Sequence, residues 1–139
     1  MNISKKAEYA LRAVISIARQ KLDKPMQIST ISDTESIPIK FLEQILLTLK
    51  NNGILKSKRG ANGGYLLAHS CSDISVGIIL EIIDGSFDPV GIKSGNHLGI
   101  GLEKCFGEMM AIVNEHLNSF SIQDILEIEE PKGLLAFEI

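Results

Sequence analysis

The chain has 139 residues, of which 45% are hydrophobic and 22% charged, as in a single domain with an apolar core. No run approaches the roughly 20 apolar residues of a membrane span, so we expect a cytoplasmic protein without a membrane partner. The net charge of −3 conceals an asymmetry, because residues 1–69 hold 11 Lys and Arg against 5 Asp and Glu, whereas residues 70–139 hold 3 against 12. This division predicts that only the first half meets a polyanion.

Three helices are predicted at the start of the chain. Apolar side chains recur every three or four residues from Ala7 to Ala18, with Ser4 as the N-cap. A short second helix, capped by Ser29, precedes a tight turn at residues 33–37. Pro38 then opens a third helix, which ends at Gly53 and has the apolar face Phe41, Leu42, Ile45, Leu46 and Leu49. Two helices joined by a short turn form a helix-turn-helix pattern.

A β-hairpin is predicted directly after the third helix. Residues 54–58 and 65–69 each have the pattern of a short strand, and the six residues between them include three glycines and one asparagine. Such a loop is typical of a hairpin whose turn needs positive φ angles. A hairpin in this position is a wing. Residues 1–85, which close with a fourth helix at 74–83, therefore predict a winged helix-turn-helix domain.

The rest of the chain divides into a loop and a long helix. Residues 86–101 contain four glycines and one proline and predict a flexible, sensor-type loop. Residues 102–139 begin with a helix whose apolar residues advance by alternating threes and fours, close to a coiled-coil seam. We expect this seam to be a dimer interface formed by Leu102, Phe106, Met109, Val113, Leu117 and Phe120. The alternative, in which the helix folds back on its own domain, stays open. The predicted fold class is mainly α with a small β-hairpin.

The sequence resembles one family of bacterial transcriptional repressors, the Rrf2 family. The resemblance runs from residue 1 to about residue 85, and it is carried by SKKAEYALRAV, by IPIKFLEQILLTLKNNGILKSKRGANGGYLL and by VGIILEIIDG. It implies a homodimer in which the long helix of each subunit crosses to its partner. It also implies binding to a pseudo-palindromic operator in double-stranded DNA, with the third helix in the major groove and the wing in the minor groove.

In this docking the first turn of the third helix reaches the base edges. Ile39 and Lys40 lie in that turn, with Glu43 one turn further along. A lysine donates to guanine O6 and N7, and a glutamate accepts from cytosine N4. The resemblance implies base contacts by Lys40 and Glu43. Family members often have a small hydroxyl residue where Lys40 stands, so we expect a different operator preference.

The wing and its flanks supply the other predicted contacts. Arg59 matches the wing arginine of the family, which enters the minor groove, where a narrow A·T-rich groove has an enhanced negative potential. The remaining set is expected at phosphates and sugars, which position a protein without specifying sequence. Its lysines are Lys50, Lys56 and Lys58, and its glycines, which allow a close backbone approach, are Gly60, Gly63 and Gly64.

The signal that such a regulator senses depends on its cysteines. Cluster-binding family members hold an iron–sulfur cluster with three cysteines in the loop before the long helix, but here that region has Cys105 alone. We therefore predict no resident metal or cofactor, and a signal that comes from a regulatory protein or a small ligand. Two alternatives stay open. One is an atypical cluster site of Cys105 and His97 with Glu8, since the resemblance implies that a carboxylate can come from the first helix of the partner. The other is oxidation of the Cys105 thiol.

Two other classes of function were weighed against DNA binding. An enzyme is not expected, because the three histidines are scattered and no nucleophile–base or phosphate-binding motif is present. A winged-helix protein-interaction module is the second rival, since the same fold also docks proteins.

Overall fold

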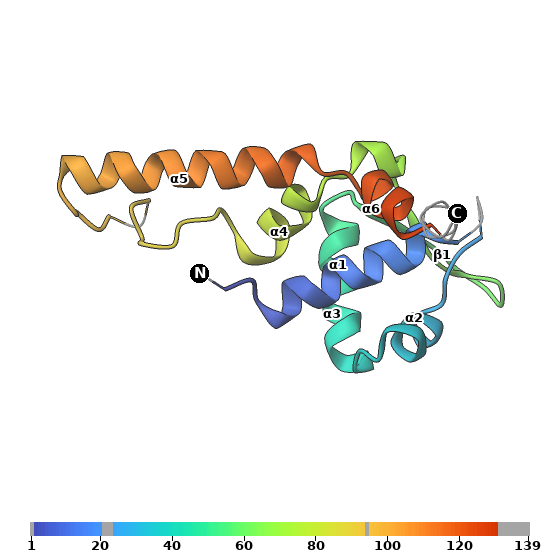
Figure 1. The fold of residues 1–139 in the computed structure, drawn as a ribbon. Coiled ribbons are helices and arrows are strands. Elements are labelled where there is room, and N and C mark those ends of the chain that lie inside the picture. Colours follow the sequence, from blue (N-terminus) through green and yellow to red (C-terminus); the bar gives the residue numbers. More distant parts are fainter. Residues whose placement is uncertain (1, 21–23, 94, 131–139) are drawn as a thin grey trace.

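The computed structural model describes residues 2–20, 24–93 and 95–130. They form a mainly helical fold with a two-stranded antiparallel sheet, which confirms the predicted fold class (Figure 1). The segments are α1 (Lys5–Ala18), α2 (Ile28–Glu35), α3 (Ile39–Asn51), β1 (Leu55–Lys58), β2 (Gly64–Leu67), the short 3-10 helix η1 (Cys71–Asp73), α4 (Val76–Asp84), α5 (Ile100–Ser119) and α6 (Ile122–Glu129). None of the described helices has the length and apolarity needed to cross a membrane.

Helix α1 is the central element of the winged part. The Ser4 hydroxyl accepts a hydrogen bond from the Ala7 amide at 3.0 Å, as expected for the N-cap. Small buried residues, including Ala10 and Ala13, leave room for close neighbours, and Val14 is fully buried among them. Helices α2, α3, α4 and α6 and strand β2 all contact α1. This helix therefore sets the relative positions of the other elements.

The turn between α2 and α3 is shorter than the sequence predicted. Helix α2 begins at Ile28 after Gln27, so Ser29 is not its N-cap, and it continues to Glu35. Ser36 then takes a left-handed conformation with φ of 55°, which is uncommon for a residue other than glycine. The Ser32 hydroxyl donates to the Ile37 carbonyl at 2.6 Å and stabilises this turn. Three residues, 36–38, thus separate the two helices.

Helix α3 buries one face and exposes the other. Leu42, Ile45, Leu46 and Leu49 have no exposed surface, because their spacing of three and four places them on the side that packs against α1. Phe41 was assigned to this face, but it is 57% exposed, since it lies at the edge of the buried stripe. Gly53 follows the helix with φ of 78°, and its amide donates to the Lys50 carbonyl. This is the helix end that the sequence predicted.

The wing consists of β1, β2 and the loop between them. Leu55 pairs with Leu67 and Lys58 pairs with Gly64, so the loop covers residues 59–63. Met26, which precedes α2, forms an additional antiparallel bridge with Tyr65. Their amides and carbonyls are paired in both directions, at 2.8 and 3.0 Å. This third backbone segment attaches the wing to the start of α2.

The second half of the chain contains α4, a loop, α5 and α6. Helix α5 extends well beyond the winged part, and α6 returns to pack near η1 and α1 (Figure 1). Two backbone hydrogen bonds join the junction of α5 and α6 to the start of α4. The Val76 amide donates to the Phe120 carbonyl and the Ile122 amide donates to the Ile74 carbonyl, each at 2.8 Å. Ser121 and Asp124 form a reciprocal capping box at the start of α6. The last part of the predicted C-terminal segment, residues 131–139, lies outside the described residues.

Candidate nucleic-acid interface

The outward face of α3 is the first part of the candidate interface. It lies opposite the buried leucines and isoleucine of the same helix. Its members are all exposed, and they comprise the predicted contacts Ile39, Lys40, Glu43 and Lys50 together with Gln44 and Leu47. No side chain caps the first turn of α3, so the free amides there are available to a phosphate oxygen. This face thus combines side chains of the types that pair with base edges with free amides of the kind that bind phosphate.

Two residues of this face, Gln44 and Leu47, were missed by the sequence analysis. Gln44 lies four residues after Lys40 and one after Glu43, and a glutamine amide pairs with N6 and N7 of adenine. Leu47 is 53% exposed although it is surrounded in sequence by apolar residues. The helical spacing of the buried residues places positions 44 and 47 outside the buried stripe. This spacing could have identified both residues as members of the outward face.

Arg12 joins α1 to the end of α2, directly before the turn that leads into α3. Its guanidinium donates to the backbone carbonyl of Glu35 at the end of α2, and its Nε lies 3.5 Å from the Glu35 carboxylate. Arg12 Nη1 also lies 3.6 Å from the carboxylate of Glu8. A planar guanidinium with several donors is suited to hold a backbone turn and two carboxylates at once. The start of α3 is therefore tied to α1 through the turn that precedes it.

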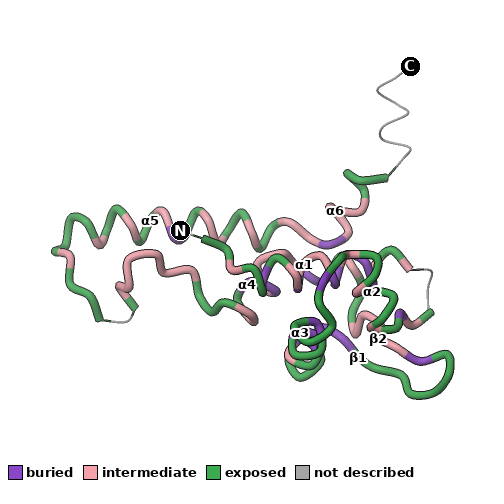
Figure 2. Tube along the Cα trace, turned by 90° about the horizontal axis from the view of Figure 1, so that it is seen from below, coloured by how far each residue is buried: buried purple, intermediate pink, exposed green. Residues whose placement is uncertain are grey.

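The wing presents the remaining cationic side chains. Lys56, Lys58 and Arg59 are all exposed, on the strand and loop that face away from the core (Figure 2). Gln27 donates from Nε2 to the Ala61 carbonyl at 3.2 Å, which holds the loop toward the start of α2. The wing loop is therefore tied to the segment that leads through α2 into α3, and β1 itself contacts α3.

The wing glycines have internal roles that the sequence analysis did not assign. Gly63 is buried, and a Cβ at this position would overlap the Lys58 carbonyl oxygen. A Cβ on Gly64 would overlap the Met26 carbonyl, and Gly64 also has φ of 142°. Only Gly60, which is exposed with open space around it, retains the freedom assumed for a close approach to DNA. Gly63 and Gly64 are thus required by the wing itself.

The proposed sensor residues do not converge within one protomer. Within residues 2–20, 24–93 and 95–130, no three His, Cys, Asp or Glu side chains are grouped so that they could hold a metal ion. Glu8 instead bonds to Lys5 at 3.0 Å, and this contact, together with Arg12, lowers the pKa of the Glu8 carboxyl. Cys105 and His97 are exposed on α5 and the preceding loop. A three-cysteine cluster does not fit a chain that has two cysteines.

Helix α5 presents two apolar faces. Met110 is buried, and Val113 and Leu117 line a cavity shared with α4, so this side packs on its own domain. A second stripe of residues at spacings of three and four is largely uncovered along the helix. It comprises Leu102 (53% exposed), Cys105, Met109 and Ile112 (68% exposed). The predicted seam is therefore divided between the two faces, and Ile112 was absent from it.

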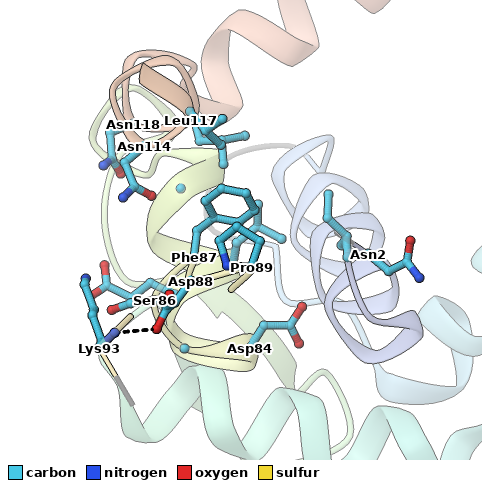
Figure 3. A pocket seen from close by; sticks show the side chains of 16 residues that line it. Asn2, Asp84, Ser86, Phe87, Asp88, Pro89, Lys93, Asn114, Leu117 and Asn118 are labelled. Atoms are coloured by element: carbon cyan, nitrogen blue, oxygen red, sulfur yellow. Dashed lines mark hydrogen bonds between the residues drawn. The ribbon is translucent and has the colours of Figure 1, made fainter. Parts of the chain in front are cut away.

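The cavity between α4, the loop and α5 has a volume of about 630 Å³. Phe87 and Pro89 of the loop lie beside Leu117 of α5 (Figure 3). Its carboxylates include Asp84, which accepts from the Ser4 amide at 3.0 Å, and Asp88, which accepts from the amides of residues 92 and 93 at 2.9 Å. A volume of this size accommodates a small organic molecule.

The fold and this surface define a winged helix-turn-helix protein of the DNA-binding type. A model of the Rrf2 family, described as an iron-dependent transcriptional regulator, matches residues 3–128. The chain therefore belongs to the Rrf2 family, whose members are transcriptional regulators and not enzymes.

Individual relatives agree with this assignment. The HTH-type transcriptional regulator IscR of Yersinia enterocolitica serotype O:8 / biotype 1B is 30% identical over an alignment 141 residues long, gaps included. The alignment covers 94% of this chain and 85% of the relative. The solved structure of CymR (YrzC), the global cysteine regulator of B. subtilis, has a TM-score of 0.82 and 28% identity, covering 94% of this chain and 99% of that chain. The structure of T. potens IscR has a TM-score of 0.80 and 27% identity, covering 94% and 89%. Relatives under both names thus share the fold over nearly the whole chain.

Proposed function

We propose that this regulator is a repressor that binds a pseudo-palindromic operator as a homodimer. The observation that carries the proposal is that α3 exposes polar side chains on its outward face while the wing that follows it exposes three cationic ones. On α3, Lys40, Glu43 and Gln44 recognise base edges in the major groove. Arg59 enters the minor groove, and Lys50, Lys56 and Lys58 contact phosphates. Repression follows from the resemblance to repressors, since bound protein blocks access to the promoter.

The exposed stripe on α5 supports the homodimer. Leu102 and Ile112 are large apolar side chains that remain more than half exposed in one chain. With Cys105 and Met109 between them, they form a stripe whose spacing of three and four matches a helix–helix seam. A second copy of α5 buries this stripe and doubles the DNA-binding surface. Two identical surfaces related by a twofold axis match two half-sites of a palindrome.

The same considerations favour a regulator without an iron–sulfur cluster. The chain supplies two thiols in place of the three cysteines that such a site takes from one loop. The cavity beside α5 is then the proposed site of a small effector, because it lies between the winged part and the helix assigned to the dimer. An effector bound there favours one relative arrangement of the two wings over others.

Selection from a random duplex library tests the DNA-binding surface. The full-length chain is used to select an operator, and binding is measured by fluorescence anisotropy for the wild type, Arg59→Ala and Lys104→Ala. Lys104 is an exposed lysine of α5 outside the proposed surface, so its removal is the matched loss of one positive charge. We expect Arg59→Ala to weaken operator binding at least tenfold, in line with a charge-assisted contact, and Lys104→Ala to leave it within twofold.

Equal affinities for the two variants would refute the assignment of the wing. Failure to select any duplex sequence, with the fold intact by circular dichroism, would favour the rival reading of a protein-interaction module.

A further inference from the structure

We propose that Leu47 of α3 contacts the C5 methyl group of a thymine in the major groove, so that the operator requires thymine at one defined position in each half-site. This inference rests on the proposed function, because it takes α3 to lie in the major groove. Leu47 is 53% exposed and lies in the part of the chain that carries the positive charge. Its role is to determine sequence preference at a base pair that no polar side chain needs to reach.

The position of Leu47 on the helix is the first argument. Seven residues separate it from Lys40, which is close to two helical turns, so the two side chains project in nearly the same direction. Leu46 and Leu49, on the opposite side, have no exposed surface. Leu47 is therefore at the centre of the outward face. Ile39 and Phe41 are also exposed but lie at the two flanks of that face, next to the buried stripe.

The chemistry of the surroundings is the second argument. Glu43 and Gln44 precede Leu47 by one turn, and Lys50 and Asn51 follow it by one turn, and all four are exposed. An apolar side chain gains nothing from a phosphate oxygen, which it would desolvate. The major-groove edges of the bases offer one apolar group, the thymine C5 methyl. A leucine among polar side chains that recognise bases and phosphates is thus matched to that methyl group.

The spacing along the helix limits where the thymine lies. Four residues of α-helix, from Glu43 to Leu47, span about 6 Å. Successive base pairs are stacked about 3.4 Å apart. The thymine is therefore within about two base pairs of the pair that Glu43 reads. That pair is identified as the position where Glu43→Gln relaxes the preference for cytosine.

The test uses the full-length protein and its selected operator. Each thymine of a half-site is replaced in turn by deoxyuridine, which lacks only the C5 methyl group, and the dissociation constant is measured by anisotropy. We expect one replacement, within about two base pairs of the Glu43 position, to weaken binding about fourfold per half-site, as for one buried methyl group. Leu47→Ala is expected to weaken binding to the thymine operator by a similar factor.

The decisive comparison is the combination of both changes. If the contact exists, Leu47→Ala does not distinguish thymine from deoxyuridine at that position. Ile128→Ala, which truncates another exposed apolar residue, on α6, retains the full difference. Equal sensitivity of Leu47→Ala and wild type to every deoxyuridine would overturn the assignment of Leu47 while leaving DNA binding intact. Failure to select any operator would instead overturn the proposed function and this inference with it.

Discussion

Cys71 and Cys105 lie toward opposite ends of α5, and their placement bears on what this regulator senses. Cys105 is in the second turn of α5, whereas Cys71 is in η1, which packs against α6 beyond the other end of that helix. The fourteen residues from Cys105 to the end of α5 alone span about 21 Å. Burial raises the pKa of the Cys71 thiol, which disfavours the thiolate that binds metals or reacts with oxidants. One protomer therefore cannot join its two thiols at a single cluster.

The absorption spectrum of the purified protein tests this account of the cysteines. Protein prepared without oxygen from iron-replete cells is expected to be colourless, because the thiolates of a typical cluster site are missing. Iron and sulfide are assayed on the same sample, and operator binding is measured as a control for native protein. A brown protein with near-stoichiometric iron would contradict the proposal, and Glu8, His97 and Cys105 would then be the ligands to mutate.

Single residues also show what sequence patterns leave undetermined. Leu42, Ile45, Leu46 and Leu49 were predicted correctly, because helical periodicity alone places them on one face. Ser36 was not predicted, since its left-handed conformation depends on contacts from Ser32 and Arg12 that local propensity does not encode. The predicted start of α2 was wrong for a related reason, because Gln27, which precedes the helix, is linked to the wing by a hydrogen bond to Ala61 that lies far away in sequence.

At the scale of whole elements, the wing depends on close backbone packing against Met26. The bridge between Met26 and Tyr65 brings the chain before α2 so near to β2 that no Cβ fits on Gly64. The glycines of the wing were predicted from the sequence both as residues of a turn with positive φ angles and as points of close approach to DNA. Which glycine faces solvent and which is packed could not be derived, because Met26 is distant from the hairpin in sequence.

Gly64→Ala tests the packing of the wing. The added methyl group overlaps the Met26 carbonyl and occupies a backbone conformation unsuited to alanine, so we expect a loss of stability on the order of 2 kcal/mol. Operator affinity is expected to fall as well, since Arg59 is displaced with the loop. Urea denaturation followed by circular dichroism measures the first effect. Gly107→Ala, in the open environment of α5, is the control and is expected to leave stability unchanged or raise it, because alanine favours a helix over glycine. A Gly64→Ala variant as stable as the wild type would refute the packing argument.

The long helix illustrates a second limit of sequence periodicity. A single apolar seam was predicted on α5, either as a dimer interface or as a face that folds back on its own domain. The helix has residues that fit each arrangement. Val113 and Leu117 face a cavity shared with α4, and Ile112 lies on the uncovered side. Spacing of three and four fits both faces, because adjacent stripes on a broad apolar helix share the same period. The face that packs on the domain can be told from the uncovered face only when the positions of the loop and α4 are known.

At the scale of the whole molecule, the two halves of the chain carry opposite charge. The positive residues belong mostly to the winged part, whereas residues 70–139 hold 12 Asp and Glu against 3 Lys and Arg. In the proposed complex, the acidic half is directed away from the DNA, because a polyanion attracts the first half and repels the second. This division orients the protein on the duplex while the total charge of −3 remains unfavourable for unspecific binding.

Ile112→Glu tests the proposed dimer. A carboxylate in the middle of a helix–helix seam is costly to bury, so we expect the variant to be monomeric at micromolar concentration, with operator affinity reduced at least tenfold. Sedimentation velocity measures the oligomeric state. Ile112 is 68% exposed in one chain, so the fold of the protomer is not affected. The control is Ile128→Glu, at a residue with 66% exposure on α6, and dimerisation of both variants would refute the interface.

The central claim, that α3 and the wing of each protomer bind duplex DNA, is tested most directly by the salt dependence of operator affinity. With about eight phosphates neutralised per dimer, the logarithm of the association constant is expected to fall with the logarithm of the salt concentration at a slope of roughly −7. Lys58→Ala removes one phosphate contact per protomer and is expected to reduce that slope by about 2 for the dimer. A slope close to zero, or one that Lys58→Ala leaves unchanged, would contradict the assigned surface.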